Sequence, residues 1–393
     1  MNRVFSVLGS GRQGLAAAYD LGLRAEASEI RLLDADLGVA TRASERLLRL
    51  LSGSSHPIPA IRPVRIDARE AKPLAAALAG SRAVLSALPA DAGGAAPRAA
   101  LAVRAHYCDL GGGGAAALDD PDVAGEARAV GVSLVPDCGL APGLVQALAV
   151  FAMSRLPRAR HVRILCGSVP QTSRPPFDER LALAAAGLWS RADGTAVCLR
   201  EGRVTELPAL TELELIDFPR PIGRCEAFLS AGGAASAPRT FEGKLETYEL
   251  KTVAAPGTFA RIRALADLGF LDAGPVAVDG VSISPRALTQ ALLEKHTGAE
   301  LPPDLVVARV ECTGDASVDA PTSYRIDFLA YPDPETGFSA VERASGFAAA
   351  IVCAMQAHGE IAPGASRLEV AVPADRFLAH LSRREFKIVH ANH

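Results

Sequence analysis

A glycine-rich turn near the start of the chain is the feature that most constrains its fold. Gly9, Gly11 and Gly14 follow a short β-rich run, Val4–Leu8, and precede an alanine-rich stretch that indicates a helix. Glycines at this spacing allow a tight turn, a close approach of the backbone to a diphosphate, and close packing of helix on strand. The amino terminus of the helix then faces the phosphates. The pattern predicts a dinucleotide-binding unit; the alternative is a glycine turn in some other α/β fold.

A carboxylate follows the next predicted strand at the expected distance. The strand Glu29–Leu33 ends in Asp34, which lies 20 residues after Gly14. A carboxylate here accepts hydrogen bonds from the ribose hydroxyls of NAD and repels the additional phosphate of NADP. Arg12 and Arg31 lie nearby in the sequence and would weaken that repulsion. We expect NAD as the cofactor, with NADP the less favoured alternative.

Strand-like and helix-like runs then alternate as far as Val135. The predicted strands are Ile61–Ile66, Ala83–Leu88, His106–Leu110 and Ser133–Val135, and the predicted helices are Arg42–Leu51, Ala71–Ala79, Pro97–Arg104 and Val123–Val130. This alternation is typical of an α/β fold with a Rossmann-type, doubly wound parallel sheet. Ligands of such sheets bind at the carboxyl ends of the strands. We therefore expect the cofactor to contact Gly9, Gly11, Arg12, Gln13, Gly14, Asp34, Asp67, Ala87, Leu88, Pro89, Leu110 and Gly111.

After Phe151 the strict alternation is lost. Strand-like runs appear at Val162–Cys166, Thr195–Leu199, Val204–Leu207, Arg224–Phe228, Tyr248–Val253, Leu305–Cys312 and Ser323–Phe328. This pattern predicts a mostly antiparallel sheet with a few inserted helices. A helix at Gly346–Ala357 and the segment Glu369–Leu381 indicate a return to the first domain. We predict an NAD-binding domain of residues 1–145 plus 346–393, and an inserted α+β domain for substrate binding and dimerisation, residues 146–345.

Composition and charge exclude several classes of protein. A net charge of −3 gives no basic surface for nucleic acid or an anionic membrane. No apolar run reaches the roughly 20 residues that span a bilayer, and the first residues lack the features of a signal peptide. Seven cysteines without a CxxC pair predict reduced thiols, and eight histidines form no metal-spaced pair. We expect a cytoplasmic protein that binds no metal, nucleic acid or membrane.

A turn of unusual composition follows the last of the alternating strands. The segment VPDCGLAPGL, Val135–Leu144, combines an acid, a thiol, two glycines and two prolines within ten residues. Helix and strand interiors exclude most of these residues, and Pro142 suits the first turn of a helix that begins there. The segment predicts a second ligand-facing turn between strand and helix.

Several motifs distributed over both predicted domains resemble those of a known family. They are GSGRQG at the start, YCDLGGG at Tyr107–Gly113, PDCGLAPGL at Pro136–Leu144, CEAFLSAGGAASAP at Cys225–Pro238 and FEGKLETYELKT at Phe241–Thr252. With them the chain resembles the saccharopine dehydrogenase family, and within it a lysine 6-dehydrogenase-like branch. The resemblance implies a homodimer or homotetramer that oxidises the ε-carbon of L-lysine with NAD, giving allysine, ammonia and NADH. It implies reductive coupling of an amine with a carbonyl, as in saccharopine or carboxynorspermidine synthesis, as the second candidate.

One segment departs from the family pattern. Where the branch continues KT-x-RYPGH, this chain reads KTVAAPGTF, with Ala254, Ala255 and Thr258 in place of arginine, tyrosine and histidine. A substrate other than lysine is therefore an open alternative. So are a catalytically idle NAD-binding sensor or scaffold, and a lyase that uses bound NAD transiently.

The oxidation of an amine requires a group that takes protons and a wall that excludes water. We predict Asp109 as the proton acceptor or ammonium partner, with a turn-forming role as the alternative. Cys138 is the second catalytic candidate, as a wall or weak acid, with a buried inert thiol as its alternative. Asp137 is expected to cap the following helix.

Substrate-binding residues are expected in the second domain. The candidates within the family-like motifs are Glu226, Tyr248, Lys251 and Thr252. An amino-acid substrate requires a cation for its carboxylate, which Lys251 or Arg224 would supply. The alternative for the charged residues is a solvated strand face, and for Tyr248 a place in the core.

Overall fold

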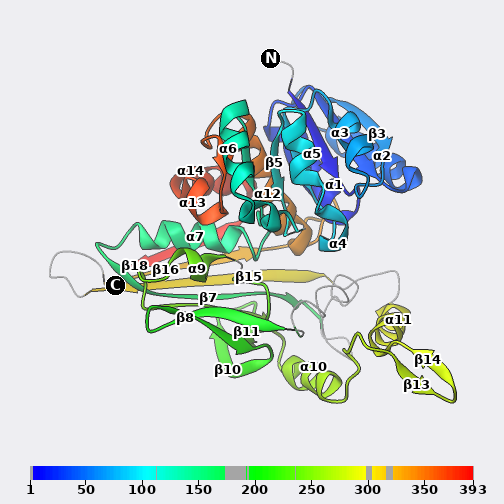
Figure 1. Ribbon diagram of the computed structural model, residues 1–393. Helices are drawn as coiled ribbons and strands as arrows, with labels where there is room; N and C mark the ends of the chain where they lie inside the picture. The colour runs from blue at the N-terminus through cyan, green and yellow to red at the C-terminus, as the bar shows by residue number, and fades with distance from the viewer. Residues whose placement is uncertain are drawn as a thin grey trace. The chain divides into compact units, whose positions relative to one another are not determined.

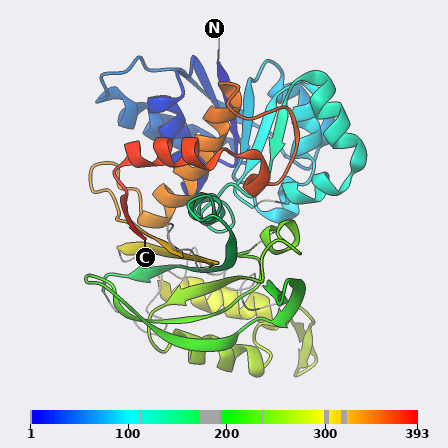
Figure 2. The same cartoon turned by 90° about the vertical axis from the view of Figure 1, so that its left-hand side faces the viewer.

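The computed structural model describes residues 3–111, 113–172, 192, 194–234, 236–297, 303–315 and 322–392. The chain forms two compact units (Figures 1 and 2). Unit 1 comprises Met1–Phe151 and Asp333–Phe386, and unit 2 comprises Ala152–Pro332 and Lys387–His393. Each unit is built on a large sheet.

Unit 1 contains a parallel sheet whose strand order within the described residues is β17-β6-β5-β4-β1-β2-β3. Its strands are β1 (Val4–Leu8), β2 (Glu29–Asp34), β3 (Ala60–Arg65), β4 (Ala83–Ser86), β5 (His106–Asp109), β6 (Ser133–Val135) and β17 (Gly364–Ala365). Every pair of neighbours is parallel. The chain winds outward from β1 to β3 and then returns to β4, so the direction of winding reverses beside β1. The predicted doubly wound sheet is confirmed.

Helices cover both faces of this sheet, as Figure 1 shows. The helices of unit 1 are α1 (Arg12–Arg24), α2 (Leu37–Ser52), α3 (Ala71–Leu78), α4 (Ala90–Gly93), α5 (Ala96–Ala102), α6 (Pro121–Val130), α12 (Ala340–Ala357), α13 (Leu368–Ala371) and α14 (Ala374–Leu381). α3, α5 and α6 contribute to one apolar core with strand residues such as Leu8 and Val84. α1 packs against α12, where a Cβ on Gly346 would lie 2.9 Å from the carbonyl oxygen of Gln13. This close contact explains why the α12 helix carries a glycine in its middle.

Unit 2 contains a second sheet in which the path of neighbours is β10-β11-β12-β7-β15-β16-β18, with β8 and β9 attached beside β12. The strands are β7 (Ala159–Pro170), β8 (Thr195–Arg200), β9 (Arg203–Pro208), β10 (Thr211–Phe218), β11 (Gly223–Leu229), β12 (Thr247–Ala254), β15 (Asp304–Gly314), β16 (Ser323–Ala330) and β18 (Lys387–Asn392). Among these pairs only β12 and β7 run parallel. The predicted mostly antiparallel second sheet is confirmed.

Smaller elements of unit 2 follow or interrupt this sheet. They are α9 (Ala237–Thr240), α10 (Thr258–Asp267), α11 (Pro285–Thr297) and the hairpin of β13 (Val276–Val278) with β14 (Val281–Ile283). The helix α7 (Leu144–Met153) begins in unit 1 and contains the point, between Phe151 and Ala152, at which the chain passes into unit 2.

The unit boundaries differ from those expected from the sequence in three places, the first being that unit 1 extends to Phe151 rather than to residue 145. The chain returns to unit 1 at Asp333 rather than at residue 346. The earlier return follows from the capping box of Ser339 and Glu342, which begins α12 six residues before the predicted helix start. The final strand β18 was expected in the first domain but pairs with β16 in unit 2. Its pairing partner lies far away in the sequence, so local pattern gave no sign of it.

Candidate functional site

The glycine turn between β1 and α1 has the geometry of a ligand-binding turn. Gly9 has a φ of 86°, and its N–H donates to the carbonyl of Leu33 at 2.8 Å. A Cβ on Gly9 would lie 2.9 Å from the carbonyl oxygen of Ala87, and one on Gly14 only 1.9 Å from that of Gly9. A Cβ on Gly11 would meet no heavy atom within 4 Å in the described residues. The first and third glycines are therefore required by packing, whereas the second faces open space.

Asp34 lies beside this turn, at the carboxyl end of β2. Its carboxylate accepts hydrogen bonds from the N–H of Ser10 at 2.9 Å and from that of Asp36 at 3.1 Å. A cavity of about 110 Å³ opens there and is lined by Gly9, Asp34, Asp67 and Leu88 among others. The structure thus brings four of the predicted cofactor residues around one cavity, at the carboxyl ends of β1 to β4.

Arg12 and Gln13, in the first turn of α1, are held by side chains from α12. The Nε of Arg12 donates to the carboxylate of Glu342, which is 2% exposed. The hydroxyl of Ser345 donates to Oε1 of Gln13 at 3.1 Å. Sequence reasoning missed both partners, because they lie more than 300 residues away in the chain. The S-x-x-E pattern at Ser339 was the one local signal for this helix start.

The remaining predicted cofactor residues follow β4 and β5. The N–H of Ala87 donates to the carbonyl of Leu8, and that of Leu110 to the carbonyl of Ser86. Pro89 precedes α4, and Gly111 has a φ of 101°. Both loops therefore lie at the carboxyl edge of the sheet next to the glycine turn.

Asp109, the last residue of β5, is completely buried and is surrounded by donors. Oδ1 accepts from the N–H groups of Gly111 at 2.8 Å and Asp137 at 2.9 Å. Oδ2 accepts from the hydroxyl of Tyr107 at 2.9 Å and from the N–H of Gly114 at 3.1 Å. Burial raises the pKa of Tyr107 well above its usual range, so its hydroxyl remains protonated and donates. The carboxylate thus connects the loops that follow β5 and β6. These contacts are those expected of a turn-forming aspartate, the alternative to a catalytic role.

Cys138 is completely buried in the second turn. Its thiol donates to the carbonyls of Val135 at 3.1 Å and Pro136 at 3.6 Å. Burial raises the pKa of the Cys138 thiol well above its usual range, and the nearby Asp109 carboxylate raises it further. The thiol is therefore neutral, as the inert alternative requires.

Asp137 precedes Cys138 and donates its N–H to Asp109, and within the described residues its carboxylate accepts no hydrogen bond from a helix N–H group. Its φ is 62°, in the left-handed region that only glycine adopts at no cost. Burial raises its pKa to about 7, with Asp109 and Glu369 adding to the shift and Arg367 opposing it. Sequence reasoning assigned this residue a capping role, since nothing local showed that Glu369 and Arg367 approach it.

The turn after Asp137 depends on its glycines. The N–H of Leu144 donates to the carbonyl of Gly139 at 2.8 Å, and the N–H of Gly143 donates to Oε1 of Gln146 at 2.7 Å. A Cβ on Gly143 would lie 2.2 Å from the carbonyl oxygen of Gly139. Pro142 precedes the helix, which begins at Leu144. The segment is a tight turn at the carboxyl edge of the sheet.

The charged substrate candidates of unit 2 have partners within that unit. The carboxylate of Glu226 accepts from the N–H groups of Gly257 at 2.7 Å and Phe259 at 2.9 Å, at the start of α10. Nζ of Lys251 donates to the carbonyl of Glu212 and pairs with Glu214, each at 2.9 Å. Glu226 therefore caps the start of α10, and Lys251 forms a salt bridge on the sheet.

The uncharged candidates are buried in the same unit. Tyr248 is 0% exposed and stacks on Phe241 with ring centroids 5.9 Å apart. The hydroxyls of Thr252 and Ser230 are 2.6 Å apart. The structure therefore does not bring Glu226, Tyr248, Lys251 and Thr252 together around a cavity that it describes.

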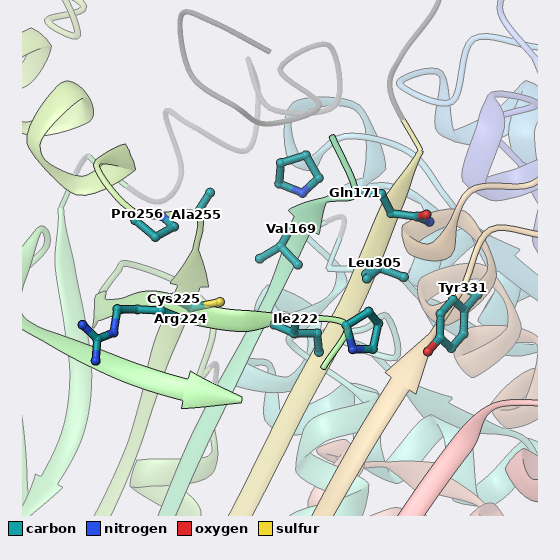
Figure 3. Close-up of a pocket in the computed structure, with 11 residues that line it drawn as sticks. Val169, Gln171, Ile222, Arg224, Cys225, Ala255, Pro256, Leu305 and Tyr331 are labelled. Atoms are coloured by element: carbon teal, nitrogen blue, oxygen red, sulfur yellow. The ribbon is translucent and has the colours of Figure 1, made fainter. Parts of the chain in front are cut away.

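A larger cavity, of about 460 Å³, lies elsewhere in unit 2. Figure 3 shows Ala255 and Pro256 on one side of it, Gln171 and Tyr331 on the other, and Val169 between them. Arg224 also lines it, paired with Asp217 at 3.1 Å. The volume lies in the range of small-molecule sites. Sequence reasoning flagged Ala255 as a departure from the family pattern but did not predict a cavity beside it.

The described residues contain neither a candidate metal-binding cluster nor a helix able to span a membrane. No group of three or more His, Cys, Asp or Glu side chains is placed to hold a metal ion there. None of the described helices combines the length and the apolar character that crossing a membrane demands. All seven cysteines are buried, and none of them forms a disulfide within the described residues.

Comparison with known families decides the relationship. The family model described as saccharopine dehydrogenase C-terminal domain matches residues 139–386, more than half of the chain. The chain belongs to the saccharopine dehydrogenase family. The family predicted from the motifs is thereby confirmed, while the lysine 6-dehydrogenase-like branch stays a prediction.

Solved structures show the same fold for this saccharopine dehydrogenase family member. The apo saccharopine dehydrogenase (L-Glu forming) of Saccharomyces cerevisiae is 16% identical with a TM-score of 0.74, and the match covers 99% of this chain and 100% of that one. The homospermidine synthase of Legionella pneumophila, solved in complex with NAD, is 11% identical with a TM-score of 0.64, covering 100% and 91%. The chain therefore has the fold of nicotinamide-dependent oxidoreductases.

Proposed function

We propose that the protein is an NAD-dependent oxidoreductase that oxidises a side-chain amine of an amino acid. The leading candidate reaction is that of an L-lysine 6-dehydrogenase, in which L-lysine is converted to allysine and ammonia. The observation that carries this proposal is the glycine turn with Asp34 beside its cavity, in a chain of the saccharopine dehydrogenase family.

The residues of unit 1 fit a dinucleotide. The open space beside Gly11 would take the diphosphate, and the first N–H groups of α1 would donate to it. Asp34 would accept from the ribose hydroxyls, and the cavity with Asp67 and Leu88 would receive the adenine. When bound, the nicotinamide supplies a two-electron acceptor for hydride.

The carboxylate of Asp34 favours NAD over NADP. It already accepts from Ser10, so the group is held at the edge of the turn where the ribose would bind. An additional phosphate at that position would meet this negative charge. Arg12, one of the two arginines expected to weaken that repulsion, pairs with Glu342.

Asp109 and Cys138 have supporting roles in this proposal. Asp109 fixes the loops that follow β5 and β6, so it would hold the edge of the site in place. Cys138, a neutral buried thiol, would form part of the apolar packing behind it. A different group is then required to take the substrate's proton.

A second candidate function is reductive coupling of an amine with a carbonyl compound. The cavity of about 460 Å³ favours it, because Ala255 leaves space where the branch pattern has a tyrosine. Such a cavity would accept a substrate larger than lysine, with an apolar chain along Val169, Ile222 and Leu305.

The test is cofactor reduction by purified protein supplied with NAD and a panel of L-lysine, ornithine, saccharopine and diamines, with NADP in parallel. We expect NADH with lysine. NADH from another amine alone would retain the reaction class and change the substrate. NADH consumption with an amine and a 2-oxo acid would favour the coupling reaction. Tight NAD binding without turnover in either direction would refute the proposal in favour of a sensor.

A further inference from the structure

Asp137 is held in a strained conformation at the edge of the sheet. It is the second residue after β6 and has a φ of 62°. Its N–H donates to Oδ1 of Asp109 at 2.9 Å, so the buried carboxylate described above fixes its backbone. A non-glycine residue in the left-handed region persists where its surroundings determine it, and such residues gather at functional sites.

The carboxylate of Asp137 lies close to Gly111, in the loop after β5. Its Oδ1 would lie 3.7 Å from a Cβ placed on Gly111, and Cγ of Pro142 would lie at the same distance from that Cβ. Within the described residues, no hydrogen bond or ion pair to this carboxylate is formed. Because Gly111 has no side chain, a group of the size of a methyl could lie beside the carboxylate without a clash.

Charged groups reach Asp137 from each element packed against it. They are Asp109 from β5, and Arg367 and Glu369 from the start of α13. Burial comes first among the causes that raise the pKa of Asp137 to about 7, and the two neighbouring carboxylates add to it more than the single arginine subtracts. A group that changes charge near neutral pH is suited to moving protons there.

We propose that the carboxylate of Asp137 is the catalytic base that takes a proton from the substrate's ammonium group. The assignment rests on the proposed function and names the proton acceptor of that site. One N–H bond of the ammonium breaks and one O–H bond forms on Asp137, leaving a neutral amine. The nitrogen lone pair can then form the C=N bond as hydride leaves the carbon for the nicotinamide, and water hydrolyses the resulting iminium.

The position agrees with this role. β6 neighbours β5, β5 neighbours β4, and β4 neighbours β1, so Asp137 lies in the same row of loops as the glycine turn. Ligands of such sheets bind along this edge. Asp109 is unsuited to the step, because its two oxygens already accept from four donors.

The first test compares Asp137→Asn with wild type across pH. Asparagine tolerates the left-handed conformation, so the turn is retained. Wild-type kcat/KM should rise through an apparent pKa of about 7. The variant should lose about 10²- to 10⁴-fold in kcat and lack this dependence, with NAD affinity unchanged. Asp122→Asn, the same change at an exposed position of α6, should leave both untouched.

The second test measures the protonation of Asp137 directly, without enzyme turnover. The carboxyl NMR signals of isotopically labelled aspartate should include one that titrates near neutral pH and is absent from Asp137→Asn. A titration of that signal near pH 4 would overturn the assignment. So would a variant with wild-type kcat and pH profile. Failure of the wild type to oxidise any amine would instead refute the proposed function, and this assignment with it.

Discussion

Asp109→Asn separates a structural from a catalytic role for the acid at the end of β5. The carboxylate accepts hydrogen bonds from two backbone N–H groups of the loop after β5, from the hydroxyl of Tyr107 within β5, and from the N–H of Asp137 after β6. An asparagine keeps one acceptor oxygen but presents an N–H₂ group to the other two donors. The hydroxyl of Tyr107 can reverse and accept, whereas the N–H of Gly114 cannot. The substitution therefore leaves a buried backbone donor without a partner.

The magnitude follows from these contacts. A buried donor without a partner costs about 1–3 kcal/mol, and hydrogen bonds to a neutral acceptor are weaker than those to a charged one. A neutral asparagine costs less free energy to bury than a charged carboxylate, and this difference offsets part of the destabilisation. We expect Asp109→Asn to lower the free energy of unfolding by about 2–4 kcal/mol.

Chemical denaturation followed by circular dichroism measures the effect. Tyr107→Phe is the matched control, because it removes one of the four hydrogen bonds and should cost less than half as much. The reasoning would be refuted if Asp109→Asn unfolded within about 0.5 kcal/mol of wild type, the range of ordinary surface substitutions, while losing turnover. Asp109 would then be a catalytic residue.

Three further outcomes are expected. Asp137→Asn should stabilise the protein near pH 8 and have little effect near pH 4. Between these pH values Asp137 is protonated in the folded state but ionised in the unfolded chain, so the stability of the wild type falls as pH rises. A shift of the pKa of Asp137 from 3.8 to about 7 corresponds to a loss of about 4 kcal/mol in the free energy of unfolding. Denaturation across pH measures this, and a parallel pH dependence of both proteins would contradict it. Asp34→Ala should weaken NAD by about tenfold or more, as loss of charged hydrogen bonds implies, and reduce the preference over NADP; equal affinities in calorimetry would remove Asp34 from the cofactor site. Gly143→Ala should destabilise far more than Gly131→Ala, because both glycines have positive φ but only the former's Cβ would meet backbone, at 2.2 Å; equal melting temperatures would refute the packing argument.

Much of unit 1 could be predicted because its signals are local. β1 and β6 have the bounds that the sequence indicated, since each is a short apolar run that a glycine-containing turn follows. The glycine turn and Asp34 likewise depend on spacing within one β-α-β unit. The packing requirement at Gly14 is the direct structural counterpart of that spacing.

The rest depends on contacts between distant parts of the chain. β18 follows two helices of unit 1 but pairs with β16, and no local pattern identifies that partner. Glu226 resembled a substrate ligand because a charged residue stood in a family motif, and the backbone amides of Gly257 and Phe259 that it caps are invisible in sequence. Asp137 was taken for a cap because its neighbour Glu369 lies in a helix more than 200 residues later.

The β10 strand was missed for a different reason. Its sequence TELELIDF alternates acids with leucines, and Leu215 is 60% exposed, so its apolar side chains do not identify a core. The strand is stabilised instead by pairing with β11 and by the contacts of Glu212 and Glu214 with Lys251. A strand that is stabilised by salt bridges to a neighbouring strand cannot be recognised from hydrophobic periodicity alone.

The central claim is that hydride passes from an amine-bearing carbon to a nicotinamide bound at the glycine turn. The most direct measurement supplies the protein with NAD and L-lysine carrying deuterium on its ε-carbon, followed by mass spectrometry of the reduced cofactor. With both ε-hydrogens replaced by deuterium, the account predicts one deuterium in each NADH formed, with loss of the signal in Asp34→Ala at limiting NAD. Release of ammonia from lysine without deuterium in the cofactor would contradict it.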